Sequence, residues 1–139
     1  GYRKRTSTFS MIDLAKYIGI PFKGRGDSFD GADCYGLLRL FYREELGIDV
    51  PDPKVCCGVT KLAFSAYLKE SQAHWKIVQK PELYCAVALA LDPNIPAQVQ
   101  HIGIYLGDKL LHTLSNVGSN ISKISDYKWA IKAYHVWLT

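Results

Sequence analysis

The sequence has no long hydrophobic run, since no stretch of about 18 apolar residues occurs in its 139 residues. A helix that crosses a bilayer needs such a stretch, so no membrane span is predicted. The sequence also lacks internal repeats and low-complexity tracts, and no secretory signal peptide is apparent at the N-terminus, where the first residue is Gly. We therefore expect one compact domain over residues 1–139.

Cysteine is present but without the spacing that builds a metal site. The four cysteines are Cys34, Cys56, Cys57 and Cys85, and no Cys-x-x-Cys pair occurs. Structural zinc sites and disulfide frameworks depend on regular spacings, so neither is predicted, and no metal or other cofactor is expected. Free cysteines are typical of proteins made in a reducing compartment such as the bacterial cytoplasm.

A strong excess of one charge is also missing. The net charge is +4, and part of it lies in a basic N-terminal stretch that is typical of a solvated chain end. This charge is compatible with a polyanionic partner such as the bacterial wall, but it does not require nucleic acid, and no nucleic-acid partner is predicted. With 48% hydrophobic residues, the chain is long enough to build a core without metal or disulfide bonds.

The N-terminal half is predicted to be helical. Ser10 is placed to cap a short helix over about 10–18, and the Gly-rich stretch 21–32 is predicted to be a loop. The main helix begins at Asp33 or Cys34, continues to about residue 46 and ends at Gly47. A further helix is predicted over 59–71.

The C-terminal half is predicted to be a run of strands. Short apolar or alternating segments give the strands 74–78, 83–91, 99–106, 109–113, 121–124 and 133–138, with a turn at Gly107-Asp108 and a loop over 92–98. Helices followed by a run of strands indicate an α+β fold, in which the helix packs on an antiparallel sheet.

Cys34 is the strongest candidate for a catalytic residue. It follows the Gly-rich loop and opens the main helix, and a helix N-terminus lowers the pKa of a thiol and makes it more nucleophilic. An isolated cysteine is more often a small buried core residue, and we interpret Cys56, Cys57 and Cys85 in that way.

Two histidines complete a candidate catalytic set. His101 begins the first strand of the predicted hairpin, and an imidazole is the natural base near neutral pH. In the partner strand, His112 is expected opposite residues 102–104, where its ring can reach the ring of His101 and fix its tautomer. His74 and His135 are interpreted as structural residues.

These segments together resemble the NlpC/P60 family of cell-wall cysteine peptidases, in the form found in phage tail-assembly proteins. The resemblance rests on residues 17–22, Asp33-Cys34-Tyr35-Gly36-Leu37, residues 46–51, and His101-Ile102-Gly103-Ile104-Tyr105-Leu106-Gly107 with His112. It covers about 10–50 and 99–139, whereas the middle of the chain, about 52–96, diverges.

The resemblance implies a papain-like core and a hydrolase that cleaves peptide stems of peptidoglycan. Cys34 would be the nucleophile, His101 the base and His112 the residue that orients it, with the backbone N–H of Cys34 helping to bind the oxyanion. Asp33, Tyr35 and Phe22 would line the substrate site. The implied partners are peptidoglycan stems and other phage tail-tip proteins. The implied location is the virion tail, made in the bacterial cytoplasm and acting in the periplasm or cell wall.

Three departures from the family pattern bear on activity. Tyr35 stands where many members have Ser, and Phe22 stands where many have a Tyr whose hydroxyl helps to bind the oxyanion. The segment Lys80-Pro81-Glu82-Leu83-Tyr84 replaces a Gly-Asp pair. A non-catalytic tail-tip subunit that keeps the hydrolase fold is therefore the alternative. A thiol acyltransferase is less favoured, because the histidine precedes the cysteine in the permuted members of the superfamily.

Overall fold

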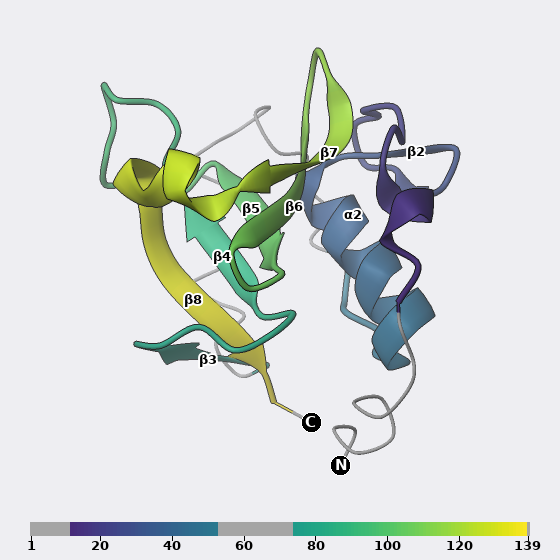
Figure 1. Ribbon diagram of the computed structural model, residues 1–139, viewed down its shortest axis with the longest axis horizontal. Coiled ribbons are helices and arrows are strands. Elements are labelled where there is room, and N and C mark those ends of the chain that lie inside the picture. The colour runs from purple at the N-terminus through teal and green to yellow at the C-terminus, as the bar shows by residue number, and fades with distance from the viewer. Residues whose placement is uncertain (1–11, 53–73, 139) are drawn as a thin grey trace.

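The computed structural model describes residues 12–52 and 74–138, and its main feature is an antiparallel sheet with a helix packed on it (Figure 1). Within these residues the sheet has six strands in the order β3-β8-β4-β5-β6-β7. The strands are β3 (Trp75–Val78), β4 (Ala86–Leu89), β5 (His101–Tyr105), β6 (Lys109–Leu114), β7 (Gly118–Lys123) and β8 (Ile131–Trp137). The α+β fold predicted from the sequence is confirmed.

The main helix begins at the predicted cysteine. Helix α2 spans Cys34–Phe41 and continues as one π-helical turn over Tyr42–Leu46. Asp33 caps its N-terminus, because one carboxylate oxygen accepts a hydrogen bond of 2.8 Å from the backbone N–H of Gly36. Gly47 ends the helix with a left-handed φ of 66°, which glycine adopts without steric cost.

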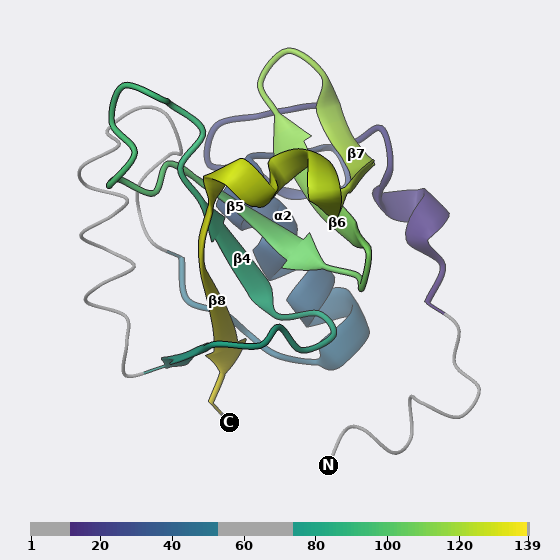
Figure 2. The same cartoon turned by 60° about the vertical axis from the view of Figure 1, so that its left-hand side comes forward.

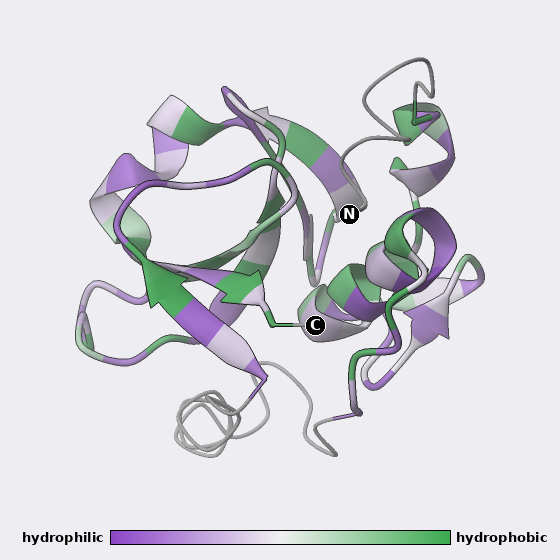
Figure 3. Cartoon of the chain, turned by 90° about the horizontal axis from the view of Figure 1, so that it is seen from below, coloured by the Kyte–Doolittle hydropathy of each residue, from purple (hydrophilic) through white to green (hydrophobic). Residues whose placement is uncertain are grey.

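Two apolar clusters lie on opposite faces of the sheet. Helix α2 covers one face, and the 3-10 helix Ile124–Ala130 lies across the other (Figures 1 and 2). The larger cluster joins α2 to β5 and β6 through buried residues that include Leu37, Leu38, Phe41, Ile102, Ile104 and Leu111. The smaller cluster lies beneath the 3-10 helix and includes Val87, Leu89, Leu110 and Ala130. In Figure 3, green hydrophobic stretches alternate with purple hydrophilic ones along the helices and strands.

The predicted loop 21–32 contains a small hairpin that packs on α2. Strand β1 (Asp27–Ser28) pairs with β2 (Gly31–Ala32). Arg39 of α2 contacts the carboxylate of Asp27 at 2.6 Å and donates to the carbonyl of Val50 at 2.8 Å. The hairpin and the segment after the helix are therefore both held to α2 by the guanidinium of Arg39.

Several predicted boundaries differ from the structure. In place of a helix over 10–18, the described residues contain a 3-10 helix, Leu14–Tyr17, whose N-cap is Asp13. The predicted N-cap Ser10 and the predicted helix 59–71 lie outside the described residues. The predicted strand 83–91 is shortened to β4, since Tyr84 has a φ of 70° that extended backbone does not allow. The 3-10 helix Ile124–Ala130 was not predicted.

None of the helices within the described residues is long and apolar enough to cross a membrane.

We expect Gly36→Ala to destabilise the protein strongly, because a Cβ at this position would lie 1.7 Å from the carbonyl oxygen of Gly26. Relieving this overlap requires the loop to move away from the start of α2, at a cost of roughly 3 kcal/mol. Gly47→Ala is the matched control: it meets open space and adds only the strain of positive φ, about 1 kcal/mol. Urea unfolding of both variants measures the difference. A smaller loss for Gly36→Ala than for Gly47→Ala would contradict this packing.

Candidate active site

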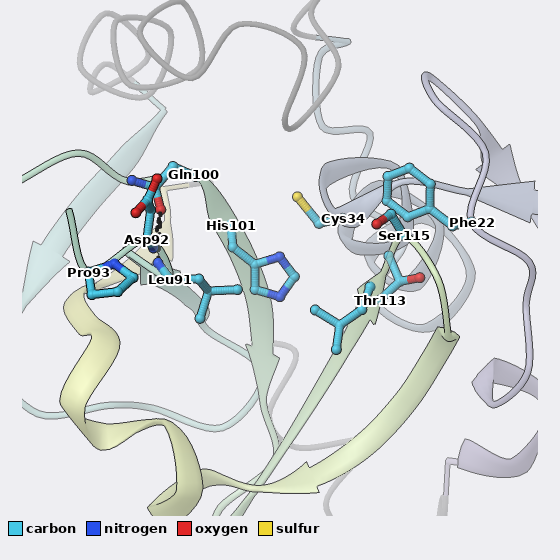
Figure 4. A pocket seen from close by; sticks show the side chains of 10 residues that line it. Phe22, Cys34, Leu91, Asp92, Pro93, Gln100, His101, Thr113 and Ser115 are labelled. Atoms are coloured by element: carbon cyan, nitrogen blue, oxygen red, sulfur yellow. Dashed lines mark hydrogen bonds between the residues drawn. The ribbon is translucent and has the colours of Figure 1, made fainter. Parts of the chain in front are cut away.

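A cavity of about 480 Å³ lies beside the start of α2 and the adjoining ends of β5 and β6 (Figure 4). Its lining combines one cysteine, one histidine and several other polar residues with apolar side chains: Phe22, Cys34, Leu91, Asp92, Pro93, Gln100, His101, Thr113, Leu114 and Ser115. We call this cavity the cleft. It brings together residues from both ends of the chain, as the sequence predicted.

Cys34 occupies the first position of α2 and lines the cleft, although only 2% of the residue is exposed. Figure 4 shows its sulfur directed toward the side of the cleft on which His101 lies. The position at a helix N-terminus, behind the Asp33 cap, confirms the predicted local structure. Partial positive charge at a helix N-terminus favours a thiolate there.

The structure corrects one expectation about cysteine, because Cys34 is disulfide-bonded rather than free. The absence of regular cysteine spacing had predicted no disulfide framework. A disulfide sulfur cannot act as a nucleophile, so Cys34 could serve as one only after reduction. Cys85 is a free, buried cysteine, as predicted, and burial raises the pKa of its thiol to about 11. Cys56 and Cys57 lie outside the described residues.

His101 and His112 meet across neighbouring strands, as predicted. The pairing of Ile104 with Leu111 places His112 in line with Gly103, inside the predicted range. Nε2 of His101 lies 2.9 Å from Nδ1 of His112, a hydrogen-bond distance. Because Nε2 of His101 is engaged in this way, Nδ1 is the nitrogen left for the cleft. Within residues 12–52 and 74–138, His101 Nδ1 makes no hydrogen bond.

Both imidazoles are held neutral by their surroundings. Burial and then the charge of His112 lower the pKa of His101 to about 3. Burial also lowers the pKa of His112 to about 4. Beyond the pair, Nε2 of His112 lies 3.0 Å from the hydroxyl of Ser122, and the ring of Tyr127 packs edge-on at 4.9 Å between centroids. A neutral imidazole has the lone pair with which a general base accepts a proton, and a pKa this far below neutral makes it a weak base.

The three predicted substrate-site residues are placed differently from one another. Phe22 is partly buried and lines the cleft, in agreement with its predicted position. Asp33 and Tyr35 line a separate, much smaller cavity on the side of Arg25 and Arg39. The two carboxylate oxygens of Asp33 accept hydrogen bonds from the backbone N–H groups of Gly36 and Arg25, at 2.8 and 2.7 Å. Its observed role is structural, and substrate binding by Asp33 and Tyr35 stays a prediction.

Four polar residues that line the cleft were not predicted as site residues: Asp92, Gln100, Thr113 and Ser115. Gln100 accepts hydrogen bonds from the backbone N–H groups of Leu91 and Asp92, at 2.8 and 3.2 Å, and donates to the carbonyls of Ile95 and Gln98. Thr113 is 1% exposed, and within the described residues its hydroxyl has no hydrogen-bond partner. The one sequence signal that could have indicated Gln100 is its position directly before His101, the candidate base.

The described residues contain no cluster of three His, Cys, Asp or Glu side chains that could hold a metal ion.

Comparison with solved structures identifies the architecture. The NlpC/P60 domain of the peptidoglycan hydrolase SagA superposes with a TM-score of 0.58 at 21% identity, covering 90% of this chain and 92% of that one. NlpC2 from Trichomonas vaginalis gives a TM-score of 0.67 at 18% identity, covering 90% of this chain and 45% of that one. The chain has the NlpC/P60 fold. An NLP/P60-family protein similar to a lipoprotein, from Staphylococcus aureus, gives a TM-score of 0.61 at 19% identity, covering 91% of this chain and 39% of that one.

Sequence comparison points in the same direction. The chain is 24% identical over 120 residues to the murein DD-endopeptidase MepS/murein LD-carboxypeptidase of Escherichia coli K12. The match covers 86% of this chain and 55% of the relative, so the chain spans about half the length of the curated protein that it matches. No family model matches the sequence. In the NlpC/P60 fold observed here, the cysteine and the two histidines contributed by α2, β5 and β6 are the candidate catalytic set.

The neutral histidine pair makes stability depend on pH. Because the folded-state pKa values of His101 and His112 lie below the usual value of 6.5, the unfolded chain binds more protons between pH 6.5 and about 4. Stability is therefore full above pH 6.5 and falls with acidification, by roughly 1.4 kcal/mol per pH unit for each histidine.

We expect the unfolding free energy of His112→Gln to fall less steeply over this window. His74→Gln, which changes an exposed ring stacked on Trp137, should keep the wild-type slope. Equal slopes for all three proteins would contradict the assignment.

Proposed function

We propose that this chain is a cysteine peptidase that hydrolyses amide bonds in the peptide stems of peptidoglycan. The observation that carries the proposal is the shared cleft, in which Cys34 and His101 form the lining and His112 holds the far nitrogen of His101 at 2.9 Å. The fold and the resemblance to murein peptidases support this choice of substrate.

Acylation begins when His101 Nδ1 accepts the proton of the reduced Cys34 thiol and the sulfur attacks the carbonyl carbon of the amide. The oxyanion that forms is stabilised by backbone N–H groups at the start of α2, with Cys34 N–H as the predicted donor. As the carbon–nitrogen bond breaks, His101 returns the proton to the leaving amine. The products of this half-reaction are a Cys34 thioester and a free amine.

Deacylation repeats the chemistry with water. His101 Nδ1 accepts a proton from the water as its oxygen attacks the thioester carbon, and the carbon–sulfur bond then breaks. The proton on His101 reprotonates the sulfur, so that the thiol is restored and the peptide leaves as a carboxylic acid. The neutral His101 is the form that both half-reactions require.

Association with a phage tail is a further part of the proposal. It rests on the resemblance of residues 33–37 to the tail-assembly form, in which an aromatic residue commonly follows the cysteine. On this proposal the protein is made in the bacterial cytoplasm, is carried in the tail tip and acts on the wall during entry. Detection of the chain in purified virions, and its absence from particles that lack tails, is the corresponding test.

The second candidate is a non-catalytic tail-tip subunit. The disulfide at Cys34 favours it, because that bond removes the nucleophile. The position of Tyr35 does not, because Tyr35 is buried away from the cleft and cannot block it. The two candidates differ in whether reduction restores hydrolysis.

We expect the reduced wild-type protein to release muropeptides from purified peptidoglycan, and the Cys34→Ala variant to lose this release by roughly 10³-fold or more. Without a reductant the wild type should be nearly inactive, since Cys34 is then in its disulfide. Mass spectrometry of the released fragments measures both activity and the bond that is cleaved. Cys85→Ala is the matched control and should remain active, because Cys85 does not line the cleft. Equal release by wild type and Cys34→Ala would remove the thiol mechanism.

We also expect the two described cysteines to react differently with iodoacetamide after reduction. Cys34 lies at a helix start and lines the cleft, whereas burial raises the pKa of the Cys85 thiol to about 11. Near neutral pH, Cys34 should therefore be alkylated first in the folded protein. Peptide mapping by mass spectrometry gives the two rates, and equal rates would identify Cys34 as an ordinary buried thiol.

A further inference from the structure

A chain of hydrogen bonds extends from the histidine pair along the neighbouring strand. His112 on β6 pairs with Asn120 on β7, and strand alternation puts Asn120 and Ser122 on the same face of the sheet as His112. Nε2 of His112 lies 3.0 Å from the hydroxyl of Ser122, and that hydroxyl donates to Oδ1 of Asn120 at 2.8 Å. Nδ2 of Asn120 donates to the carbonyl of Gly118 at 3.2 Å.

The carbonyl of Gly118, at the end of this series of hydrogen bonds, determines which atom is the donor in each of them. The carbonyl of Gly118 can only accept, so the amide nitrogen of Asn120 must face it and the amide oxygen must face Ser122. The hydroxyl of Ser122 has one proton, which it donates to that amide oxygen. The oxygen of Ser122 can therefore offer only a lone pair to His112, and Nε2 of His112 must carry the proton between them.

The proton positions on the two imidazoles follow from the same hydrogen bonds. A neutral imidazole has one N–H and one acceptor nitrogen, so His112 with a proton on Nε2 accepts at Nδ1. Nε2 of His101, 2.9 Å away, must then be the donor. The remaining nitrogen of His101, Nδ1, carries the lone pair, and it belongs to the residue that lines the cleft together with Cys34.

We propose that Asn120 and Ser122 are positioning residues that hold both histidines as Nε2–H tautomers and thereby keep a proton acceptor on His101 Nδ1. The inference deepens the proposed hydrolase function, because a base is needed only if Cys34 is a nucleophile. Neither residue touches the substrate: both lie on β7, and neither lines the cleft. Their effect passes to the reaction only through the orientation of protons.

Loss of Asn120 is the informative change. Without the amide oxygen, the hydroxyl of Ser122 is able to rotate and donate its proton to Nε2 of His112. The proton of His112 would then lie on Nδ1 and be donated to Nε2 of His101, which moves the proton of His101 to Nδ1. In that state the cleft is faced by an N–H that cannot accept the proton of the Cys34 thiol.

The direct test is ¹⁵N NMR of ring-labelled histidines in the reduced protein near pH 7. The wild type should show His101 and His112 protonated at Nε2, and Asn120→Ala should show a population protonated at Nδ1. Finding His112 protonated at Nδ1 in the wild type, or unchanged tautomers in Asn120→Ala, would overturn the inference. This readout needs no substrate, so it decides the inference even if the protein hydrolyses no peptidoglycan.

The kinetic test separates positioning from a general loss of structure. Ser122→Ala should lower kcat by roughly 10–100-fold with little change in KM, as expected for loss of a group that orients a reacting one. Ser122→Thr keeps the hydroxyl and should restore most of the activity. Ser125→Ala changes an exposed serine of the adjoining 3-10 helix and should leave kcat unchanged. Wild-type kcat in Ser122→Ala, or a failure of Ser122→Thr to restore activity in a folded protein, would overturn the role given to Ser122.

Discussion

The candidate site depends on the hydrogen bond between His101 and His112. This bond is a product of sheet register, since β5 and β6 pair so that the two rings meet on the same face at 2.9 Å. A slip of one residue in either strand would move its ring to the opposite face and separate the pair. The turn at Gly107, with a φ of 93°, and the buried pairing of Ile104 with Leu111 hold that register. The geometry of the candidate site and the stability of the sheet therefore depend on the same backbone pairing.

Burial of the pair has opposite consequences for the proposed activity and for stability. A dry environment keeps both rings neutral, so that each ring keeps a nitrogen lone pair. The same environment opposes protonation, so acid favours the unfolded chain, in which both rings can take up protons. Tyr127 comes from the 3-10 helix that lies on the same face of the sheet as His112, and its ring adds an apolar contact to that histidine. The 3-10 helix that was absent from the sequence predictions thus helps to keep the pair dry.

The parts of the site that could be predicted are those with local signals. The apolar periodicity and Gly47 predicted the helix that begins at Cys34. The alternation of apolar and polar residues around Gly107 predicted the hairpin that brings the two histidines together. The disulfide at Cys34 gave no local signal, because cysteine pairing depends on how distant segments approach. The 3-10 helix over Ile124–Ala130 lacks a side-chain N-cap hydrogen bond, and so had none of the usual start signals.

The role of Asp33 was ambiguous for another reason, since a carboxylate before a helix can serve as a cap or face a ligand. Only the hydrogen bonds to Gly36 and Arg25 show that it caps.

The position of Gln100 links one side of the cleft to His101, the candidate base. This residue immediately precedes His101, and its amide group makes hydrogen bonds to backbone along the segment from Leu91 to Gln98, of which Leu91, Asp92 and Pro93 line the cleft. The residue that holds this side of the cleft is thus joined to His101 by a single peptide bond. Exchange of this segment for one of different length would shift His101 as well, unless the transplanted turn still fits the amide of Gln100. Specificity in this scaffold should consequently evolve by side-chain replacement at Leu91, Asp92 and Pro93 more readily than by insertion or deletion.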